Sequence, residues 1–238
     1  MNNRSLIIIP AFNEEENIAY VIKDIRKNHP SLSFIVINDG SEDSTELVLN
    51  KNKALYITHP INLGYGASLK TGYQYALKNG YDFVIQIDGD CQHRADQIQK
   101  LFSAYQEGET DIIIGSRYIK DNEAKLSFAK KLAHKIFAAL IHTKNQTPIK
   151  DITSGFQLLN KKAYSYFAFL EDFPTQHPDA NFLLLSSKEG FKLKEIPVLM
   201  KERGKGTSMF TGWKTFFYVI EMIINIFIIY IRSGGKKR

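Results

Sequence analysis

The chain has 238 residues, of which 44% are hydrophobic and 24% are charged, and its formal net charge is +6. Such a composition is ordinary for a folded globular protein with one large or two small domains. The single cysteine, Cys91, excludes an internal disulfide framework and is compatible with a reducing compartment. The positive charge indicates an anionic partner, such as a phosphorylated substrate or a membrane surface. Because the lysines are scattered rather than gathered with stacking aromatic residues, we expect no nucleic acid partner.

In the first half of the chain, short apolar runs alternate with segments whose apolar residues recur at helical spacing. Strands that alternate with helices of this length are typical of an α/β fold, in which a mostly parallel, Rossmann-like sheet carries helices on both faces. The strands are expected over residues 6–9, 34–37, 55–57, 83–87 and 112–114, and the helices over 14–27, 45–50, 69–79 and 96–105.

The second half of the chain is less regular. Its pattern again predicts helices and strands, with one stretch of glycines and charges that indicates a loop. The expected elements are a helix with a basic side at 125–142, a strand-like run at 152–159, a helix at 181–188, a strand at 191–198 and the loop at 201–208.

The most apolar stretch, residues 216–231, is shorter than the roughly 20 residues that span a bilayer. It is predicted to form an amphipathic helix with a wide apolar surface, and three basic residues, Lys236 to Arg238, follow it. Such a helix either lies in a membrane interface or packs against the domain or a second copy of the chain. The wide apolar surface favours the membrane. We therefore expect a domain over residues 1–210 and a membrane-associated helix with a basic tail over 211–238.

Two carboxylates, Asp88 and Asp90, flank Gly89 directly after the apolar run 83–87. In an open α/β sheet, ligands bind at the carboxyl ends of the strands, which is where this run delivers both side chains. Two carboxylates one residue apart can share Mg²⁺ or Mn²⁺, and such a cation commonly bridges carboxylates to substrate phosphates. Gln92 and His93 follow, and His93 is expected to orient the acidic pair.

Polar residues also follow the other predicted strands, at the same edge of the sheet. A turn after the first strand exposes side chains, an aspartate after the second can accept hydrogen bonds from a base or ribose, and glycines at a helix start let backbone N–H groups approach an anion. An arginine after the fifth strand supplies a fixed cation. These residues are Asn13, Glu14, Asp39, Gly64, Lys70 and Arg117.

The segments that carry these residues resemble, in order, the motifs of family 2 glycosyltransferases of the GT-A fold. Within that family the chain is most similar to the dolichyl-phosphate mannose synthase-like branch and its bacterial polyprenyl-phosphate relatives. The match covers roughly residues 5 to 210. Its segments are IIIPAFNEEENI, VINDGSEDST, NLGYGASLKTG, IQIDGDCQH, DIIIGSRY, DITSGFQLL and GFKLKEIPVLMKERGKGTS.

The resemblance implies inverting transfer of a sugar from a nucleoside diphosphate donor. The growing charge on the leaving nucleoside diphosphate would need a metal ion and cations beside it. By position, the resemblance places Pro10, Ala11, Glu14 and Asp39 at the nucleoside, Asp88, Asp90 and Gln92 at Mg²⁺ or Mn²⁺ (directly or through the diphosphate), and Arg117 and Arg203 at phosphates.

Two positions depart from the family pattern. Asn38 stands where the family often has a first aspartate, although Asp39 remains. Asn181 stands where many members have glutamate, so the candidate base is Asp179. A sugar hydroxyl needs such a base, whereas a lipid phosphate is already anionic at neutral pH and needs none. Asp179 would then position the acceptor or the donor sugar, or only cap the helix that follows.

The leading hypothesis is a glycosyltransferase bound peripherally at the cytoplasmic face of a membrane. It would use a UDP- or GDP-sugar and transfer the sugar to polyprenyl phosphate or to a lipid-linked or cell-surface glycan. One alternative is a soluble enzyme that extends a polysaccharide and uses the apolar terminus to form a homo-oligomer. Another is a non-catalytic module that keeps a nucleotide pocket and recruits a partner, although the intact Asp88, Asp90 and Arg117 argue against it.

Overall fold

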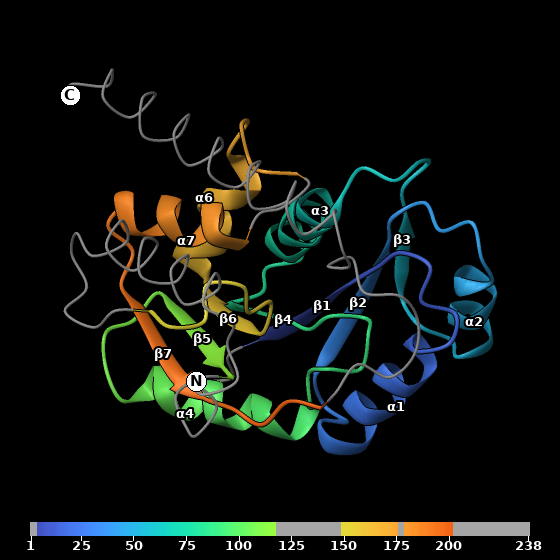
Figure 1. Cartoon of the computed structure of the whole chain (residues 1–238), viewed down its shortest axis with the longest axis horizontal. Helices are drawn as coiled ribbons and strands as arrows, with labels where there is room; N and C mark the ends of the chain where they lie inside the picture. The colour runs from blue at the N-terminus through green and yellow to red at the C-terminus, as the bar shows by residue number, and fades with distance from the viewer. Residues whose placement is uncertain (1–3, 118–148, 176–178, 202–238) are drawn as a thin grey trace, which may run out of the picture.

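The computed structural model describes residues 4–117, 149–175 and 179–201, and Figure 1 shows their arrangement around a central sheet. The strands are β1 (Ser5–Ala11), β2 (Ser33–Asn38), β3 (Tyr56–Thr58), β4 (Phe83–Gln86), β5 (Ile112–Ser116), β6 (Gln157–Asn160) and β7 (Leu193–Pro197). The helices are α1 (Ile18–Asn28), α2 (Thr45–Lys51), α3 (Tyr65–Lys78), α4 (Ile98–Gln106), α6 (Lys161–Phe169) and α7 (Asp179–Lys188), with a 3₁₀ turn, η1 (Ala95–Gln97), before α4.

The described strands form a seven-stranded, mostly parallel sheet in the order β3-β2-β1-β4-β6-β5-β7. The order reverses at β1, which pairs with β2 on one side and with β4 on the other. Such a reversal opens a crevice at the carboxyl ends of the strands, where ligands bind in folds of this kind. Among the described strands, β6 alone runs against its neighbours, β4 and β5. The segment that leads into β6 therefore reaches the same edge as the ends of β1, β2, β4 and β5.

The core lies on both faces of the sheet, because alternate residues of the central strands point to opposite sides. Leu6 and Ile8 of β1 pack in a cluster with residues of α3, α6 and α7. Ile7 and Ile9 pack in a second cluster with residues of α1, α2 and α4. Burial on both faces explains why the strands are continuous apolar runs rather than alternating ones. The prediction of a mostly parallel sheet with helices on both faces is confirmed (Figure 1).

Several element boundaries differ from the predicted ones. The first helix begins at Ile18 rather than Glu14, because the Glu14 carbonyl accepts hydrogen bonds from the N–H groups of Asn17 and Ile18 in a preceding turn. Helix α3 begins earlier than predicted, directly after Gly64, whose φ of 100° suits glycine. The strand-like run 152–159 contains a strand only from Gln157 onward.

Helix α6 was not predicted, although its sequence carries two recognisable signals. Its N-cap residue, Asn160, accepts a hydrogen bond from the Ala163 N–H through its side chain. Its buried residues, Ala163, Tyr164, Phe167 and Ala168, recur at helical spacing. Burial, together with the nearby Asp82 carboxylate, raises the pKa of the Tyr164 phenol to about 12, so this side chain stays neutral in the core.

The close approach of α3 to the sheet depends on Gly72. A Cβ added there would lie 2.5 Å from Cγ2 of Ile8 in β1. We expect Gly72→Ala to lower the free energy of unfolding by about 1–3 kcal/mol, the usual effect of overpacking, even though alanine is the better helix former. Urea denaturation measures the change.

The matched control for this substitution is Gly108→Ala, since a Cβ at Gly108 meets nothing within 4 Å. This control is expected to change the free energy of unfolding by less than about 0.5 kcal/mol. Equal losses in the two variants would contradict the role assigned to Gly72.

The predictions for 125–142, for 202–208, for the helix at 216–231 and for a domain boundary near residue 210 fall outside the described residues. Within residues 4–117, 149–175 and 179–201, no helix is both long enough and apolar enough to cross a membrane.

Candidate functional site

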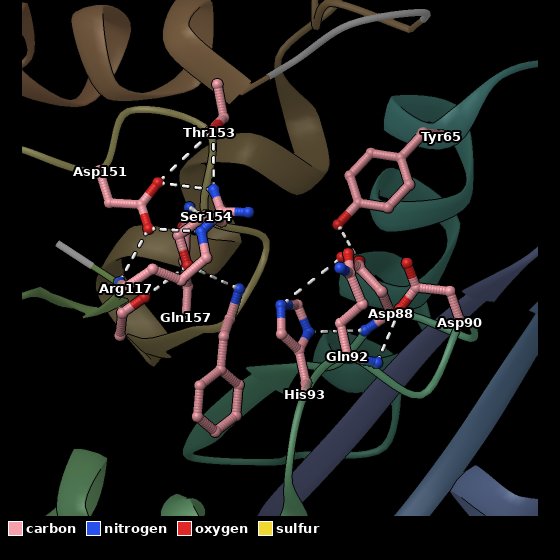
Figure 2. Close-up of polar contacts among 12 residues, drawn as sticks. Tyr65, Asp88, Asp90, Gln92, His93, Arg117, Asp151, Thr153, Ser154 and Gln157 are labelled. Atoms are coloured by element: carbon pink, nitrogen blue, oxygen red, sulfur yellow. Dashed lines mark hydrogen bonds and ion pairs between the residues drawn. The ribbon is translucent and has the colours of Figure 1, made fainter. Parts of the chain in front are cut away.

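The predicted site residues gather at one edge of the sheet because parallel strands deliver their carboxyl ends there. Asp88 and Asp90 follow β4, Asp39 follows β2, and Arg117 follows β5. The antiparallel β6 brings a further segment, residues 151–156, to the same edge. Figure 2 shows this segment facing the loop after β4, residues 88–93, which we call the acidic loop.

The side chain of Asp88 is enclosed from three directions, and Figure 2 shows two of them, Tyr65 and His93. The Tyr65 hydroxyl donates to Oδ1 at 2.8 Å, and Nε2 of His93 lies 3.6 Å from Oδ2. The backbone of Gly155 closes the third side, because a Cβ there would lie 2.9 Å from both carboxylate oxygens. The Asp88 side chain nevertheless keeps 28% exposure, so its oxygens remain accessible to a ligand.

His93 orients the start of this loop through its ring. The backbone N–H of Asp88 donates to Nδ1 of His93 at 3.0 Å, so Nδ1 carries no proton and a neutral ring has its proton on Nε2, facing the Asp88 carboxylate. The ring stacks on Phe156 at a centroid distance of 5.2 Å. The expected orienting role of His93 thus has a geometric basis.

Asp90 lies deeper, with 8% of its surface exposed. Its Oδ1 accepts the Gln92 N–H at 3.0 Å, which closes a tight turn over Cys91, whose φ is +68°. Burial raises the pKa of the Cys91 thiol, and the nearby carboxylates of Asp90 and Glu14 raise it further. The thiol therefore stays protonated at neutral pH and is a poor metal ligand.

The predicted metal ligands, Asp88, Asp90 and Gln92, are all hard oxygen donors that suit Mg²⁺ or Mn²⁺. In the part of the chain that the structure describes, no three His, Cys, Asp or Glu side chains are grouped to hold a metal ion by themselves. A cation here would need further oxygen ligands, and a donor diphosphate is such a source. The residues present therefore fit a cation that binds together with its phosphate substrate.

Asp39, predicted to contact the nucleoside, is 3% exposed and heavily hydrogen-bonded. Its Oδ1 accepts from the Leu63 N–H at 3.0 Å and lies 2.6 Å from Nδ1 of His59, while Oδ2 accepts the Gly64 N–H at 2.8 Å. Because Nδ1 of His59 donates to this carboxylate, Nε2 of a neutral ring accepts from the Thr71 hydroxyl at 2.9 Å. In the glycine-rich segment, residues 62–67, the N–H groups of Leu63 and Gly64 thus bind the carboxylate of Asp39.

The loop after β1 is held by the loop after β2. Asn13, at a φ of +54°, accepts the Glu42 N–H through its side chain and donates its own N–H to the Ser41 hydroxyl. The N–H of Glu14 donates to the Thr45 hydroxyl, and its carboxylate accepts from the Asn17 amide.

The end of β1 also lies against the acidic loop. Pro10 and Ala11 occupy the last two positions of β1. A Cβ added at Gly89 would lie 3.1 Å from the Pro10 carbonyl oxygen. Glycine at this position therefore lets the acidic loop close onto the loop after β1, so the residues predicted to hold the nucleoside and the metal are neighbours.

Arg117 pairs with Asp151, which lies in the segment before β6 (Figure 2). Its Nε and Nη2 donate to the two oxygens of Asp151 at 2.8 and 2.7 Å, and Nη2 also donates to the Thr153 hydroxyl. Asp151 is fully buried, whereas the Arg117 side chain keeps 30% exposure. The fixed positive charge that the sequence predicted after the fifth strand is therefore the guanidinium group of Arg117, and the buried Asp151 carboxylate sets its orientation.

Three other predicted residues have different placements. Lys70 donates to the Leu170 carbonyl oxygen at 2.6 Å, so its ammonium group binds the end of α6. Asp179 is the first residue of α7. Arg203 lies outside the described residues, and its predicted role stays a prediction.

Four residues of this edge were not singled out from the sequence: His59, Tyr65, Asp151 and Gly155. Tyr65 lies within the glycine-rich segment 62–67 and His59 lies shortly before it, but nothing in their spacing shows which carboxylate each one contacts. Asp151 and Gly155 come to the edge because β6 runs antiparallel, and the antiparallel direction of this one strand was not predicted. The family segment DITSGFQLL was the available signal for both.

A groove of about 610 Å³ lies away from this edge, on the outer side of α1. It is lined by Ala19, Tyr20, Ile22, Lys23, Arg26, Lys27 and Asn52. Two of its basic residues, Arg26 and Lys27, lie in the last turn of α1, where cations complement the helix dipole, and Arg26 donates to the Lys53 carbonyl oxygen. This groove contributes nothing to the acidic site.

The fold has solved counterparts. Glucosyl-3-phosphoglycerate synthase from Mycobacterium tuberculosis, solved with Mn²⁺, UDP-glucose and phosphoglyceric acid, superposes with a TM-score of 0.65 over 86% of this chain and 73% of that chain. The sequences are 19% identical, so the likeness concerns the fold. The chain thus has a GT-A-like α/β fold.

Curated relatives match over most of their length. Polyprenol monophosphomannose synthase of Mycolicibacterium smegmatis is 26% identical, over 88% of this chain and 82% of the relative. UDP-N-acetylglucosamine–dolichyl-phosphate N-acetylglucosaminyltransferase of Methanococcus voltae is 25% identical, over 90% and 94%. The model of the family described as glycosyl transferase family 2 matches residues 6–167. These motifs, the fold and this match show that the chain belongs to glycosyl transferase family 2, and it is a glycosyltransferase.

Proposed function

We propose that this glycosyltransferase moves a sugar, with inversion, from a nucleoside diphosphate donor to a polyprenyl phosphate at a membrane surface, using Mg²⁺ or Mn²⁺. The observation that carries the proposal is the acidic loop after β4. There Asp88 is held in one orientation with its oxygens still accessible, and Asp90 lies two residues away. Two such carboxylates at the switch point of the sheet suit a cation that binds with a diphosphate.

The donor would lie across the ends of β1, β2 and β4. Its nucleoside would approach Pro10, Ala11, Glu14 and Asp39, and its diphosphate would lie near Asp88, Asp90 and Gln92. A bound cation would stabilise the charge that develops on the leaving diphosphate. Arg117, oriented by Asp151, adds a fixed positive charge at the same edge, and Arg203 is proposed to reach the phosphates as well.

The acceptor is proposed from the chemistry and from the relatives. Two curated relatives are named for the synthesis of polyprenol monophosphomannose and for transfer of N-acetylglucosamine to dolichyl phosphate. A phosphate monoester is anionic at neutral pH and attacks without a base, so Asp179 would position the acceptor rather than remove a proton. The net charge of +6 suits an anionic acceptor and a membrane surface with anionic lipid. We propose that residues 211–238 hold the enzyme peripherally at the cytoplasmic face.

The test is release of nucleoside diphosphate from a panel of UDP- and GDP-sugars, with Mn²⁺ and polyprenyl phosphate in lipid vesicles. A parallel reaction contains membranes from the source cell, and Asp90→Asn is assayed beside the wild type. We expect release from one donor, with the sugar recovered on the lipid, and loss of both signals in the variant.

Other outcomes separate the alternatives. Sugar recovered on a glycan rather than on lipid would identify a polysaccharide-extending enzyme. If the folded wild-type protein releases no nucleoside diphosphate from any donor, the proposed transfer is wrong and a nucleotide-binding module takes its place.

A further inference from the structure

One short segment at the start of α3, residues 63–66, contacts two carboxylates of the site edge and also the backbone of Thr175. The N–H groups of Leu63 and Gly64 bind the Asp39 carboxylate, and the hydroxyl of Tyr65 binds the Asp88 carboxylate. The N–H of Gly66 donates to the Thr175 carbonyl oxygen at 2.6 Å. The predicted nucleoside carboxylate and the predicted metal carboxylate are therefore joined through adjacent residues at the start of one helix.

The space around this segment leaves it little freedom. A Cβ added at Gly66 would lie 1.9 Å from the Pro174 carbonyl oxygen, so the helix start rests directly on the backbone of residues 174–175. On the other side, a Cβ at Gly155 would lie 2.7 Å from the Tyr65 hydroxyl oxygen. The phenol is thereby confined between α3 and the segment before β6, with its hydroxyl directed at Asp88 (Figure 2).

We propose that Tyr65 is a positioning residue, whose hydroxyl fixes Asp88 in the orientation that receives the divalent cation and couples that cation to nucleotide bound at Asp39. The proposal rests on the proposed function, since it assigns the cation to Asp88. The hydrogen bond from Tyr65 occupies one acceptor position of Oδ1, and each carboxylate oxygen has two, so both oxygens remain able to bind a metal. Partners that orient a ligating carboxylate in this way commonly govern metal affinity.

The coupling follows from the shared segment. A nucleotide that contacts Asp39 acts on a carboxylate whose hydrogen-bond donors, Leu63 and Gly64, immediately precede Tyr65. If nucleotide and cation stabilise the same arrangement of residues 63–66, each raises the affinity of the other by the same factor. Removing the hydroxyl of Tyr65 breaks the link to Asp88 and leaves the link to Asp39 intact.

Tyr65→Phe tests the proposal, because it removes the hydroxyl and keeps the ring that packs against the core. Binding of Mn²⁺ alone is measured by the loss of the electron paramagnetic resonance signal of free Mn²⁺, and then again with UDP and with GDP. We expect the variant to bind Mn²⁺ about 10-fold more weakly, a typical effect of losing such a partner. The gain in Mn²⁺ affinity on adding nucleotide should shrink as well.

Tyr56→Phe is the matched control. The Tyr56 hydroxyl also donates to a carboxylate, that of Glu46, at 3.2 Å, but on the exposed side of α2. This control should bind Mn²⁺ as the wild type does. In the transfer assay, Tyr65→Phe should require more Mn²⁺ for half-maximal rate while its kcat at saturating Mn²⁺ stays close to that of the wild type.

Unchanged or tighter Mn²⁺ binding by a folded Tyr65→Phe variant would overturn the proposal while transfer by the wild type still stands. A kcat that falls while Mn²⁺ affinity stays the same would overturn it too, since Tyr65 would then act on substrate rather than through Asp88. If the wild-type protein binds no Mn²⁺ with or without nucleotide, both this proposal and the metal-dependent function are wrong.

Discussion

Asp90→Asn is expected to lower the rate of sugar transfer by about 10² to 10³-fold, the usual effect of removing one group that stabilises charge in the transition state. Asp90 is 8% exposed, and its Oδ1 receives the Gln92 N–H, so the carboxylate is set in place by the loop itself. Asparagine keeps the shape and an acceptor oxygen, but it loses the negative charge that attracts a divalent cation. The measurement is initial rate against Mn²⁺ concentration for the wild type and the variant.

Asp96→Asn provides the control for this change, because it removes the same charge six positions later at an exposed pair with Arg94. It should retain the wild-type rate. Circular dichroism of each variant establishes that it is folded. A fully active Asp90→Asn variant with an unchanged Mn²⁺ requirement would show that the cation, if present, does not bind at the loop after β4.

Asp151→Asn is expected to lower the free energy of unfolding by about 3 kcal/mol, at the low end of the range for breaking a buried ion pair. Asp151 is fully buried, and both of its oxygens accept from the guanidinium of Arg117. The amide of asparagine would leave the positive charge of Arg117 without its negative partner. Its NH₂ group would also face an N–H donor of the guanidinium. The loss stays at the low end because the Arg117 side chain keeps 30% exposure to water.

Urea denaturation at pH 7 measures this effect, and Asp96→Asn again serves as the comparison. The Arg94 and Asp96 side chains are 35% and 38% exposed, so breaking that pair should cost less than about 1 kcal/mol. If the two substitutions lower the free energy of unfolding equally, the Asp151 pair does not have the stabilising role assigned to it. Transfer activity of Asp151→Asn is expected to fall as well, because Arg117 loses its orientation.

Much of the fold could be predicted from the sequence because the strands are buried on both faces. Each central strand, such as β1 with Leu6 to Ile9, is a continuous apolar run that is recognisable without knowing its neighbours. Boundaries were less predictable where a side chain far along the chain intervenes. The first helix begins late because Glu14 is held in a turn, with its N–H bound to Thr45, thirty-one residues away.

The direction of β6 was the feature of the fold that local pattern left open. A run of apolar residues has the same spacing whichever way the strand runs, so Gln157–Asn160 gave no sign of being antiparallel. That direction brings Asp151 and Gly155 to the edge where the other strands end. Without it, neither the partner of Arg117 nor the confinement of Tyr65 could be derived.

By itself, the sequence determined the inventory of the site: acidic residues after β4 and β2, a glycine-rich helix start, an arginine after β5, and the family to which these motifs belong. Only the tertiary structure decided which groups bind one another. It showed that backbone N–H groups at the glycine-rich start of α3 bind Asp39, that Lys70 binds the end of α6, and that Tyr65 binds Asp88. The physical reason is that hydrogen bonds are short-ranged and directional, so partners tens of residues apart are chosen by strand order and helix packing.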